Sequence, residues 1–247
     1  MAKSYVVSPA NAITYTVSAT NEDTDYPDGN LLDRDPANPF KATTTASTLS
    51  LSHSSAARKV IGIINPSVLA GASTYTAGAV NVTCPARTAD GQAANHFKVL
   101  DLGASTTTSV VISGASATVQ IGELILGSAL TEVNWIWGDS GSVAIDSTWP
   151  VNEIRTFGGS DWIYDKGYRI RTASGTLKRE ADRLVWLAIA QAAKGRNIPF
   201  LFIPDLDVND CWYVRFSESS LRGLRQMQNV SEVTITLEEV SSGLPLS

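Results

Sequence analysis

Residues 231 to 240 read SEVTITLEEV, and apolar and polar residues alternate along most of this stretch. Val233, Ile235 and Leu237 fall on one face of an extended chain, whereas glutamates and threonines fall on the other. A period of two residues is the pattern of a β-strand that buries one face and exposes the other. The stretch therefore predicts a strand near the end of the sequence, with those three apolar residues in a core.

The neighbouring stretches extend this strand to an α+β unit. IPFLFIPD at residues 198 to 205 and CWYVRF at residues 211 to 216 predict two further strands. EIRTF at residues 153 to 157 and DWIYDKGYRIRTA at residues 161 to 173 predict a hairpin whose turn is Asp165-Lys166-Gly167. Together with one helix, these strands predict a helix packed on a β-sheet.

That helix is predicted over residues 176 to 196, TLKREADRLVWLAIAQAAKGR. Thr176 is placed to cap its start, and Gly195 lies where a left-handed residue commonly ends a helix. Leu184 and Ala188 are predicted to pack against the sheet that contains Ile235. The apolar face predicted from spacings of three and four consists of Leu177, Ala181, Leu184, Val185, Ala188 and Ala192. The predicted solvent-facing residues are Lys178, Arg179, Asp182 and Arg183.

The first half of the sequence contains short alternating or apolar stretches that end at Gly, Pro, Asn or Ser. Strands are predicted at residues 12–20, 47–53, 60–73, 74–83, 98–103, 108–114 and 117–127. Many short strands with no helix between them indicate an antiparallel sandwich. Residues 138 to 150, GDSGSVAIDSTWP, look like a connection. We therefore predict a mainly β protein, with a jelly-roll-like sandwich over residues 1–147 and an α+β assembly domain over residues 148–247.

Composition narrows the classes of partner. Apolar residues make up 43% of the sequence and charged residues only 17%, and the net charge is −5. An acidic chain without a basic patch argues against nucleic acid as a partner. The sequence contains no run of 18 apolar residues that would predict a membrane span. The first residues, MAKSYVVSPANAITYTV, do not resemble a signal peptide, so we expect folding in a cytoplasm.

No set of residues in the sequence predicts catalysis or a cofactor. The two cysteines, Cys84 and Cys211, are far apart, and His53 and His96 have no acid–base partner at a useful spacing. The sequence also shows no catalytic triad, paired carboxylates in a plausible context or phosphate-binding loop. We therefore expect that the protein is not an enzyme and has no cofactor.

Residues 26 to 44, YPDGNLLDRDPANPFKATT, combine three prolines and three aspartates with apolar residues. The segment contains too many turn residues for a helix and too many apolar residues for a linker. A structural interpretation is that Asp33 and Asp35 cap turns while Leu31, Leu32 and Phe40 reach into the sandwich.

Several of these stretches resemble a family of phage tail-tip proteins. The resemblance rests on YP..NLLDRDP....F, GIINPSVLAGAS and IGELILG in the first half, and on PFLFIPD, CWYVRF and VTITLEEV in the second. It covers most of residues 5 to 240. In this family the first part is built like a galactose-binding, discoidin-like jelly roll. The chain departs from the family at Phe40, where the family often has Trp.

The resemblance implies a structural component of the tail tip or baseplate of a tailed phage or phage-like particle. Such proteins assemble as rings around the tail axis, and they join the tail tube to the host-recognition parts. The implied partners are other tail-tip and tail-tube proteins and further copies of this chain, as a trimer or hexamer. The implied location is the virion, after assembly in the host cytoplasm.

The resemblance also suggests a ligand for the loop of residues 26 to 44, because jelly rolls of this kind bind sugar through loops at one end. Carboxylates accept hydrogen bonds from sugar hydroxyls, and an aromatic ring supplies an apolar face. The candidate residues for a host surface glycan are Asp33, Asp35, Asn38, Phe40 and Lys41. Calcium is a further candidate ligand, held by Asp23, Asp25, Asp28 and nearby carbonyl groups.

Arginines in the second half are candidates for contacts between subunits. Arg169 and Arg171 lie in a predicted strand, and Arg222 and Arg225 lie in a loop before the last strand. The alternative is that Arg169 and Arg171 are solvated, and that the loop of Arg222 and Arg225 is an ordinary hairpin connection. Trp135, Trp137 and Trp149 are predicted to lie at the junction between the two domains, with an exposed aromatic platform as the alternative.

Two other classes of function stay open at the level of sequence. A free-standing carbohydrate-binding module would be monomeric and would bind sugar by itself. A polysaccharide-degrading enzyme would need a carboxylate pair, which the sequence does not suggest.

Overall fold

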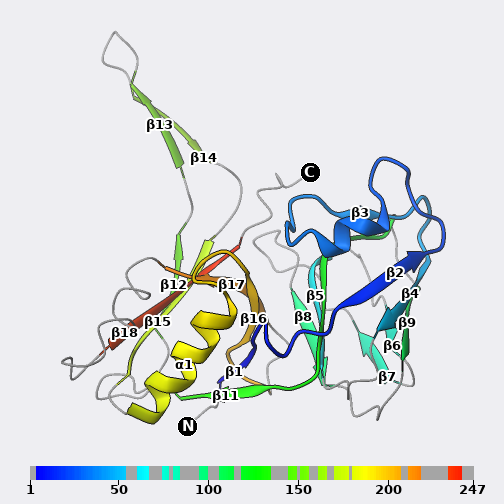
Figure 1. Ribbon diagram of the computed structural model, residues 1–247. Helices are drawn as coiled ribbons and strands as arrows, with labels where there is room; N and C mark the ends of the chain where they lie inside the picture. Colours follow the sequence, from blue (N-terminus) through cyan, green and yellow to red (C-terminus); the bar gives the residue numbers. More distant parts are fainter. Residues whose placement is uncertain are drawn as a thin grey trace.

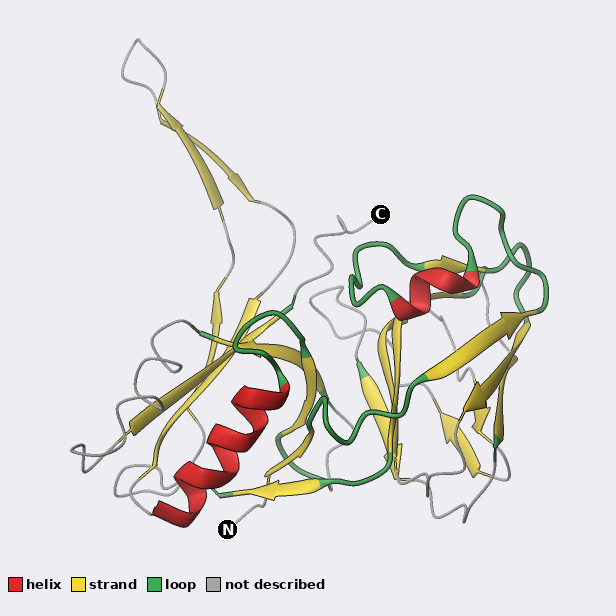
Figure 2. Ribbon diagram, viewed as in Figure 1, coloured by secondary structure: helices red, strands yellow, loops and turns green. Residues whose placement is uncertain are grey.

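The structure is a computed structural model that describes most of the chain. The described residues are 4–53, 60–66, 74–77, 80–83, 95–99, 106–113, 118–134, 144–148, 151–155, 161–165, 170–177, 180–206, 211–217 and 233–240. They form antiparallel sheets and one α-helix (Figures 1 and 2). The predicted fold class, mainly β with a helix packed on a sheet, is confirmed.

The largest sheet, which we call sheet A, has seven strands from both ends of the chain. Its order is β11 (Thr131–Val133), β1 (Ser4–Val7), β16 (Phe200–Ile203), β17 (Trp212–Phe216), β18 (Val233–Glu239), β15 (Ile170–Leu177) and β12 (Ala144–Thr148). All neighbouring strands are antiparallel. Val233, Ile235 and Leu237 of β18 are buried, as their alternation predicts.

Helix α1 (Glu180–Ala192) packs on sheet A, but not by the predicted face. Trp186, Ile189, Ala190 and Ala193 are buried against sheet A, whereas Leu184 is 52% exposed. The predicted packing of Leu184 and Ala188 is therefore wrong. Both stripes have helical spacing, and the observed one contains the much larger apolar surface of the tryptophan.

The two ends of this helix differ in how well the sequence predicts them. Thr176 is not an N-cap, because it pairs with Thr234 inside β15. Asp182, predicted to face solvent, is buried. Gly195 has a φ of 77° and donates its N–H to the carbonyl of Ala190, so its predicted left-handed role at the C-terminus is confirmed.

The other two large sheets form the predicted antiparallel sandwich. Sheet B has the order β3 (Phe40–Lys41), β10 (Gln120–Gly127), β5 (Val60–Pro66) and β8 (His96–Val99). Sheet C has the order β2 (Tyr15–Ala19), β4 (Ser47–His53), β9 (Thr107–Ser113), β6 (Thr74–Ala77) and β7 (Val80–Thr83). Leu49 and Leu51 of sheet C and Ile61 and Ile63 of sheet B belong to one buried cluster that fills the space between these sheets.

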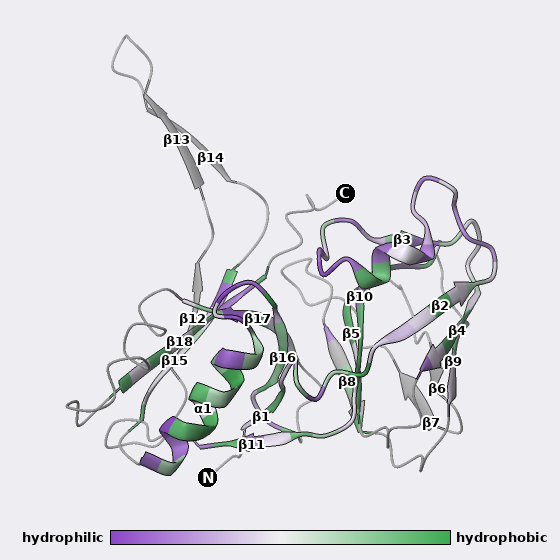
Figure 3. Cartoon of the chain, viewed as in Figure 1, coloured by the Kyte–Doolittle hydropathy of each residue, from purple (hydrophilic) through white to green (hydrophobic). Residues whose placement is uncertain are grey.

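Sheet B is also covered on its other side, by sheet A. We call the buried cluster between them the seam; it consists of Val7, Val60, Ile64, Phe97, Leu201, Ile203, Cys211 and Tyr213. A Cβ atom on Gly62 of β5 would lie 2.9 Å from Cδ2 of Leu201, so the two sheets approach closely there. Burial on both faces explains why β5 is continuously apolar rather than alternating. Figure 3 shows β5, β10 and β16 largely in green.

Sheet pairing crosses the predicted domain boundary. β1 and β11 precede residue 147, yet they join β16 in sheet A. After β1 the chain leaves sheet A to form the sandwich, and it returns to sheet A at β11, next to β1. Domains of residues 1–147 and 148–247 remain a prediction, and each would take part of sheet A.

The predicted hairpin exists with a different turn. β13 (Val151–Arg155) pairs with β14 (Asp161–Asp165), so residues 156 to 160 connect its strands. The predicted turn at residue 165 is wrong, because β15 pairs with β12 and β18 instead. β13 and β14 form a separate two-stranded sheet that projects away from sheet A (Figure 1).

Candidate functional site

The loop between β2 and β3 covers one end of the sandwich and is fixed there by buried apolar residues. Leu31, in the short 3-10 helix η1 (Asp28–Leu32), is 0% exposed and belongs to the sandwich core. Phe40, the first residue of β3, is also fully buried and pairs with Ile121. Leu32 is 43% exposed, so its predicted inward position is wrong. Two adjacent residues of a helical turn point in different directions, and only Leu31 faces the core.

The predicted sugar-binding groups of this loop hydrogen bond to one another. Oδ1 of Asp33 accepts the N–H of Asp35 at 2.8 Å, and Oδ1 of Asp35 accepts the N–H of Ala37 at 3.0 Å. The side-chain amide of Asn38 donates to Oδ2 of Asp33 at 2.8 Å, and Asn30 donates to Oδ1 of Asn38 at 3.1 Å. These are the local bonds by which Asp and Asn stabilise turns. They agree with the structural interpretation of Asp33 and Asp35.

A pair that the sequence interpretation missed lies beside this network. Nζ of Lys41 lies 3.6 Å from the ring centroid of Tyr26, which is a cation–π contact, and the N–H of Lys41 donates to the carbonyl of Tyr26. Both residues are half-buried. Because Phe40 is buried, Tyr26 rather than Phe40 is the aromatic residue accessible at this loop. The YP dipeptide at the start of the stretch was the available signal.

The carboxylates considered for calcium also contact the backbone. Oδ1 of Asp23 accepts the N–H of Asp25, and Oδ2 of Asp28 accepts the N–H of Ala19, each at 3.0 Å. Within the described ranges, no group of three or more His, Cys, Asp or Glu side chains could hold a metal ion.

The second feature missed in the sequence is a buried acid beneath residues 33 to 35. Glu123 of β10 is 4% exposed, and its Oε2 has no hydrogen-bond partner. The pKa of Glu123 is raised from its usual 4.5 to about 9; burial is the largest cause, and the negative charge of Asp33 is the next. The backbone hydrogen bond and the positive charge of Arg34 act in the opposite direction. The only signal in the sequence is a lone acid in the apolar strand IGELILG.

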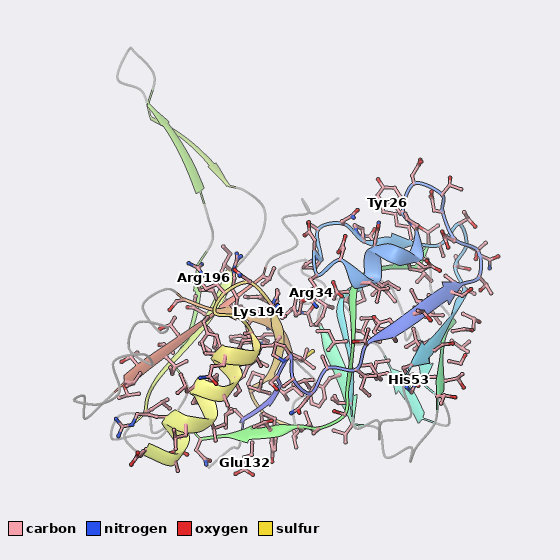
Figure 4. All side chains as sticks on the ribbon, in the orientation of Figure 1. Tyr26, Arg34, His53, Glu132, Lys194 and Arg196 are labelled. Atoms are coloured by element: carbon pink, nitrogen blue, oxygen red, sulfur yellow. The ribbon has the colours of Figure 1, made fainter. Side chains whose placement is uncertain are left out.

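Glu123 lies where the loop, the sandwich and sheet A meet. Its register partner on β5 is Ile64, a residue of the seam, so Glu123 is on the face of sheet B that turns toward sheet A. Burial and the nearby Glu123 raise the pKa of Tyr213 in β17. The same two causes raise the pKa of Tyr15 in β2. Figure 4 places Arg34 between the loop and sheet A.

Of the four arginines predicted to contact other subunits, the structure describes only Arg171. Arg169, Arg222 and Arg225 lie outside the described residues. Arg171 of β15 forms an ion pair within its own chain, with Nη2 2.6 Å from Oε1 of Glu239, and its guanidinium lies 4.4 Å from the ring centroid of Trp212. This arginine therefore stabilises sheet A internally.

Of the remaining candidates, the structure describes the surroundings of His53 and Cys211. Nε2 of His53 lies 3.0 Å from Oγ1 of Thr108 across β4 and β9, and Cys211 is a buried thiol of the seam. Trp135, Trp137 and Trp149 lie outside the described residues.

Comparison with known proteins assigns no family. No protein-family model matches the sequence, and no curated protein matches it either. None of the helices in the described part of the chain has the length and apolar character needed to cross a membrane.

Proposed function

We propose that this chain is a structural subunit of the tail tip of a tailed phage or phage-like particle. It forms part of a ring that links the tail tube to the host-recognition parts. The sequence resemblance to tail-tip proteins suggests this role. The observation that carries it is the two-stranded sheet β13–β14, which we call the arm.

The arm pairs with no other strand among the described residues, and it projects from the rest of the chain (Figure 1). An isolated two-stranded hairpin is at best marginally stable in water, because it buries too little apolar surface. A neighbouring subunit would supply the missing surface. Contact with a neighbouring subunit would therefore stabilise the arm.

The register of the arm supports an asymmetric contact. Ile154 lies opposite Trp162, and Asn152 lies opposite Tyr164. Directly opposed positions belong to one face of an antiparallel pair, so by register Asn152, Ile154, Trp162 and Tyr164 share a face. Ile163 shares the other face with charged residues, since it lies opposite Glu153. The face of Ile154 and Trp162 is the one that docks on the next copy of the chain.

Two substitutions of the same kind test this contact. Ile154→Ser should shift the protein from an oligomer to a monomer in light scattering, and Ile163→Ser is the matched control on the other face of the arm. A chain that is already monomeric at tens of micromolar, and that binds glycan by itself, would instead be a free-standing carbohydrate-binding module.

Antibody labelling of intact particles gives a second measurement. The proposal requires label at one end of the tail, and label on the capsid or along the tube would refute it.

A further inference from the structure

The burial of the Glu123 carboxyl is explained neither by packing of the sandwich core nor by the proposed contact of the arm. Its carboxyl is enclosed on the seam-facing side of β10, and Oε2 is left without a hydrogen bond. An unpartnered buried carboxyl is costly to maintain, and an ionised one is more costly still. The site therefore favours a neutral, protonated Glu123 when it is closed.

The groups around Glu123 strengthen this preference. From the loop, from β2 and from β17, the charged or titratable residues that face it are Asp33, Arg34, Asp35, Tyr15 and Tyr213. The backbone hydrogen bond and the positive charge of Arg34 favour the ionised form, but burial and the charges of the two aspartates outweigh them. The hydroxyl of Tyr15 donates to the carbonyl of Leu124, so it is engaged elsewhere. An ionised Glu123 would thus add a third carboxylate at a site with one cation.

The covering segment is thin and locally strained. Asp33, Arg34 and Asp35 are exposed to solvent on their outer side, although Glu123 beneath them is buried. Arg34 has a φ of 65°, in the left-handed region that residues with a Cβ atom rarely adopt. The turn bonds of Asp33 and Asp35 hold the segment in this conformation, and the backbone of Arg34 joins it to Glu123 by a hydrogen bond.

We propose that residues 33 to 35 form a proton-linked flap over Glu123. The flap is closed while the carboxyl of Glu123 holds its proton, and opening exposes the carboxyl to water, where it releases that proton. Atoms and charge balance in this step, since one proton passes from Glu123 to solvent. This inference does not depend on assembly into a tail.

The pH dependence follows from the two states of the carboxyl. The closed state has a pKa of about 9, and an exposed Glu123 has its usual 4.5. Because the open state binds fewer protons between these values, the opening equilibrium rises by up to about tenfold per pH unit across that window. It is constant below the window and above it. Acidic conditions therefore hold the flap shut, and neutral to alkaline conditions loosen it.

Opening would also change the seam. Tyr213 belongs to sheet A, and Glu123 belongs to the sandwich. Release of the flap admits water to the place where these two parts are in electrostatic contact. The flap is thus a device by which pH sets access to the boundary between the sandwich and sheet A.

Hydrogen exchange on the full chain tests the proposal. Exchange of the amides of residues 33 to 35, 37 and 38, corrected for intrinsic rates, should accelerate by up to about tenfold per unit from pH 5 to pH 9 in the wild type. Glu123→Gln keeps the shape of the neutral acid and cannot ionise, so its corrected rates should be independent of pH. Glu132→Gln, an exposed glutamate on β11, is the matched control and should behave like the wild type.

A second measurement reads the proton directly. In carbon-detected NMR, the carboxyl carbon of Glu123 should remain in its protonated position at pH 7. Titration at the value of an ordinary glutamate would overturn the proposal. Equal pH slopes in wild type and Glu123→Gln would overturn it as well, because the opening would then be linked to another group.

Discussion

Leu31 and Leu32 allow one substitution to be compared at adjacent residues with opposite surroundings. Leu31 is fully buried in the sandwich core, whereas Leu32 is 43% exposed. Leu31→Ala removes about three buried carbon groups at about 0.8 kcal/mol each and leaves a cavity, so the free energy of unfolding should fall by about 3 to 4 kcal/mol. Leu32→Ala removes a side chain that already contacts water, and it should cost about 1 kcal/mol or less.

Urea unfolding followed by tryptophan fluorescence measures both costs, provided that the m-value is unchanged between variants. For a chain of this size, the Leu31→Ala cost corresponds to a melting temperature lower by about 6 to 16 °C. The comparison controls for chemistry and loop position, since only burial differs. A Leu32→Ala cost equal to that of Leu31→Ala would refute the orientation of η1 and the idea that a single leucine anchors the loop.

Three further predictions follow from buried groups. Trp186→Ala should lower the free energy of unfolding by about 3 to 5 kcal/mol, because the tryptophan is fully buried on sheet A. Leu184→Asp, at the exposed face of the helix, should change it by about 0.5 kcal/mol. A larger cost for Leu184→Asp than for Trp186→Ala in urea unfolding would show that the helix packs by the other face. Glu123 holds a proton in the folded state that the unfolded chain releases above pH 4.5, so wild-type stability should fall as pH rises from 4.5 to 9, by at most about 3 kcal/mol at pH 7 and 6 kcal/mol at pH 9. Glu123→Gln should lack this loss, and parallel stability curves for the two proteins between pH 5 and pH 9 would disprove it. Glu239→Gln should lower the free energy of unfolding by about 2 kcal/mol because it removes the charge that pairs with the largely buried guanidinium of Arg171, and an unchanged midpoint in chemical unfolding would show that the pair adds nothing.

The parts of the fold that are local in sequence could be predicted from it. Period-two alternation identifies β4 and β18, because each buries one face, and Leu49, Leu51 and Ile235 are all in the core. The turn roles of Asp33 and Asp35 could be predicted for the same reason, since their bonds reach only a few residues along the chain.

Features that depend on distant contacts could not be predicted. Two helical stripes compete in α1, and only the packing against sheet A selects the one with Trp186. The pairing of β1 with β16 joins residues almost two hundred positions apart, and no local pattern encodes it. Glu123 looks like an ordinary polar residue of a strand until the loop covers one side and Tyr213 approaches on the other. The raised pKa of Glu123 results from the packing of the loop, β10 and β17, which no single stretch of sequence encodes.

The connection between the sandwich and sheet A determines how a mechanical load would pass between them. The sandwich leaves sheet A after β1 and returns at β11, and these two strands are adjacent in the sheet. Gly62 and Leu201 leave no room for even one added carbon atom between the sandwich and sheet A without a shift of that leucine. Two connections and a closely packed seam make independent rotation of the sandwich costly, because any hinge would have to open buried apolar surface. In a ring held by the arm, a load on the sandwich would therefore pass into sheet A, whereas a loose tether would absorb it.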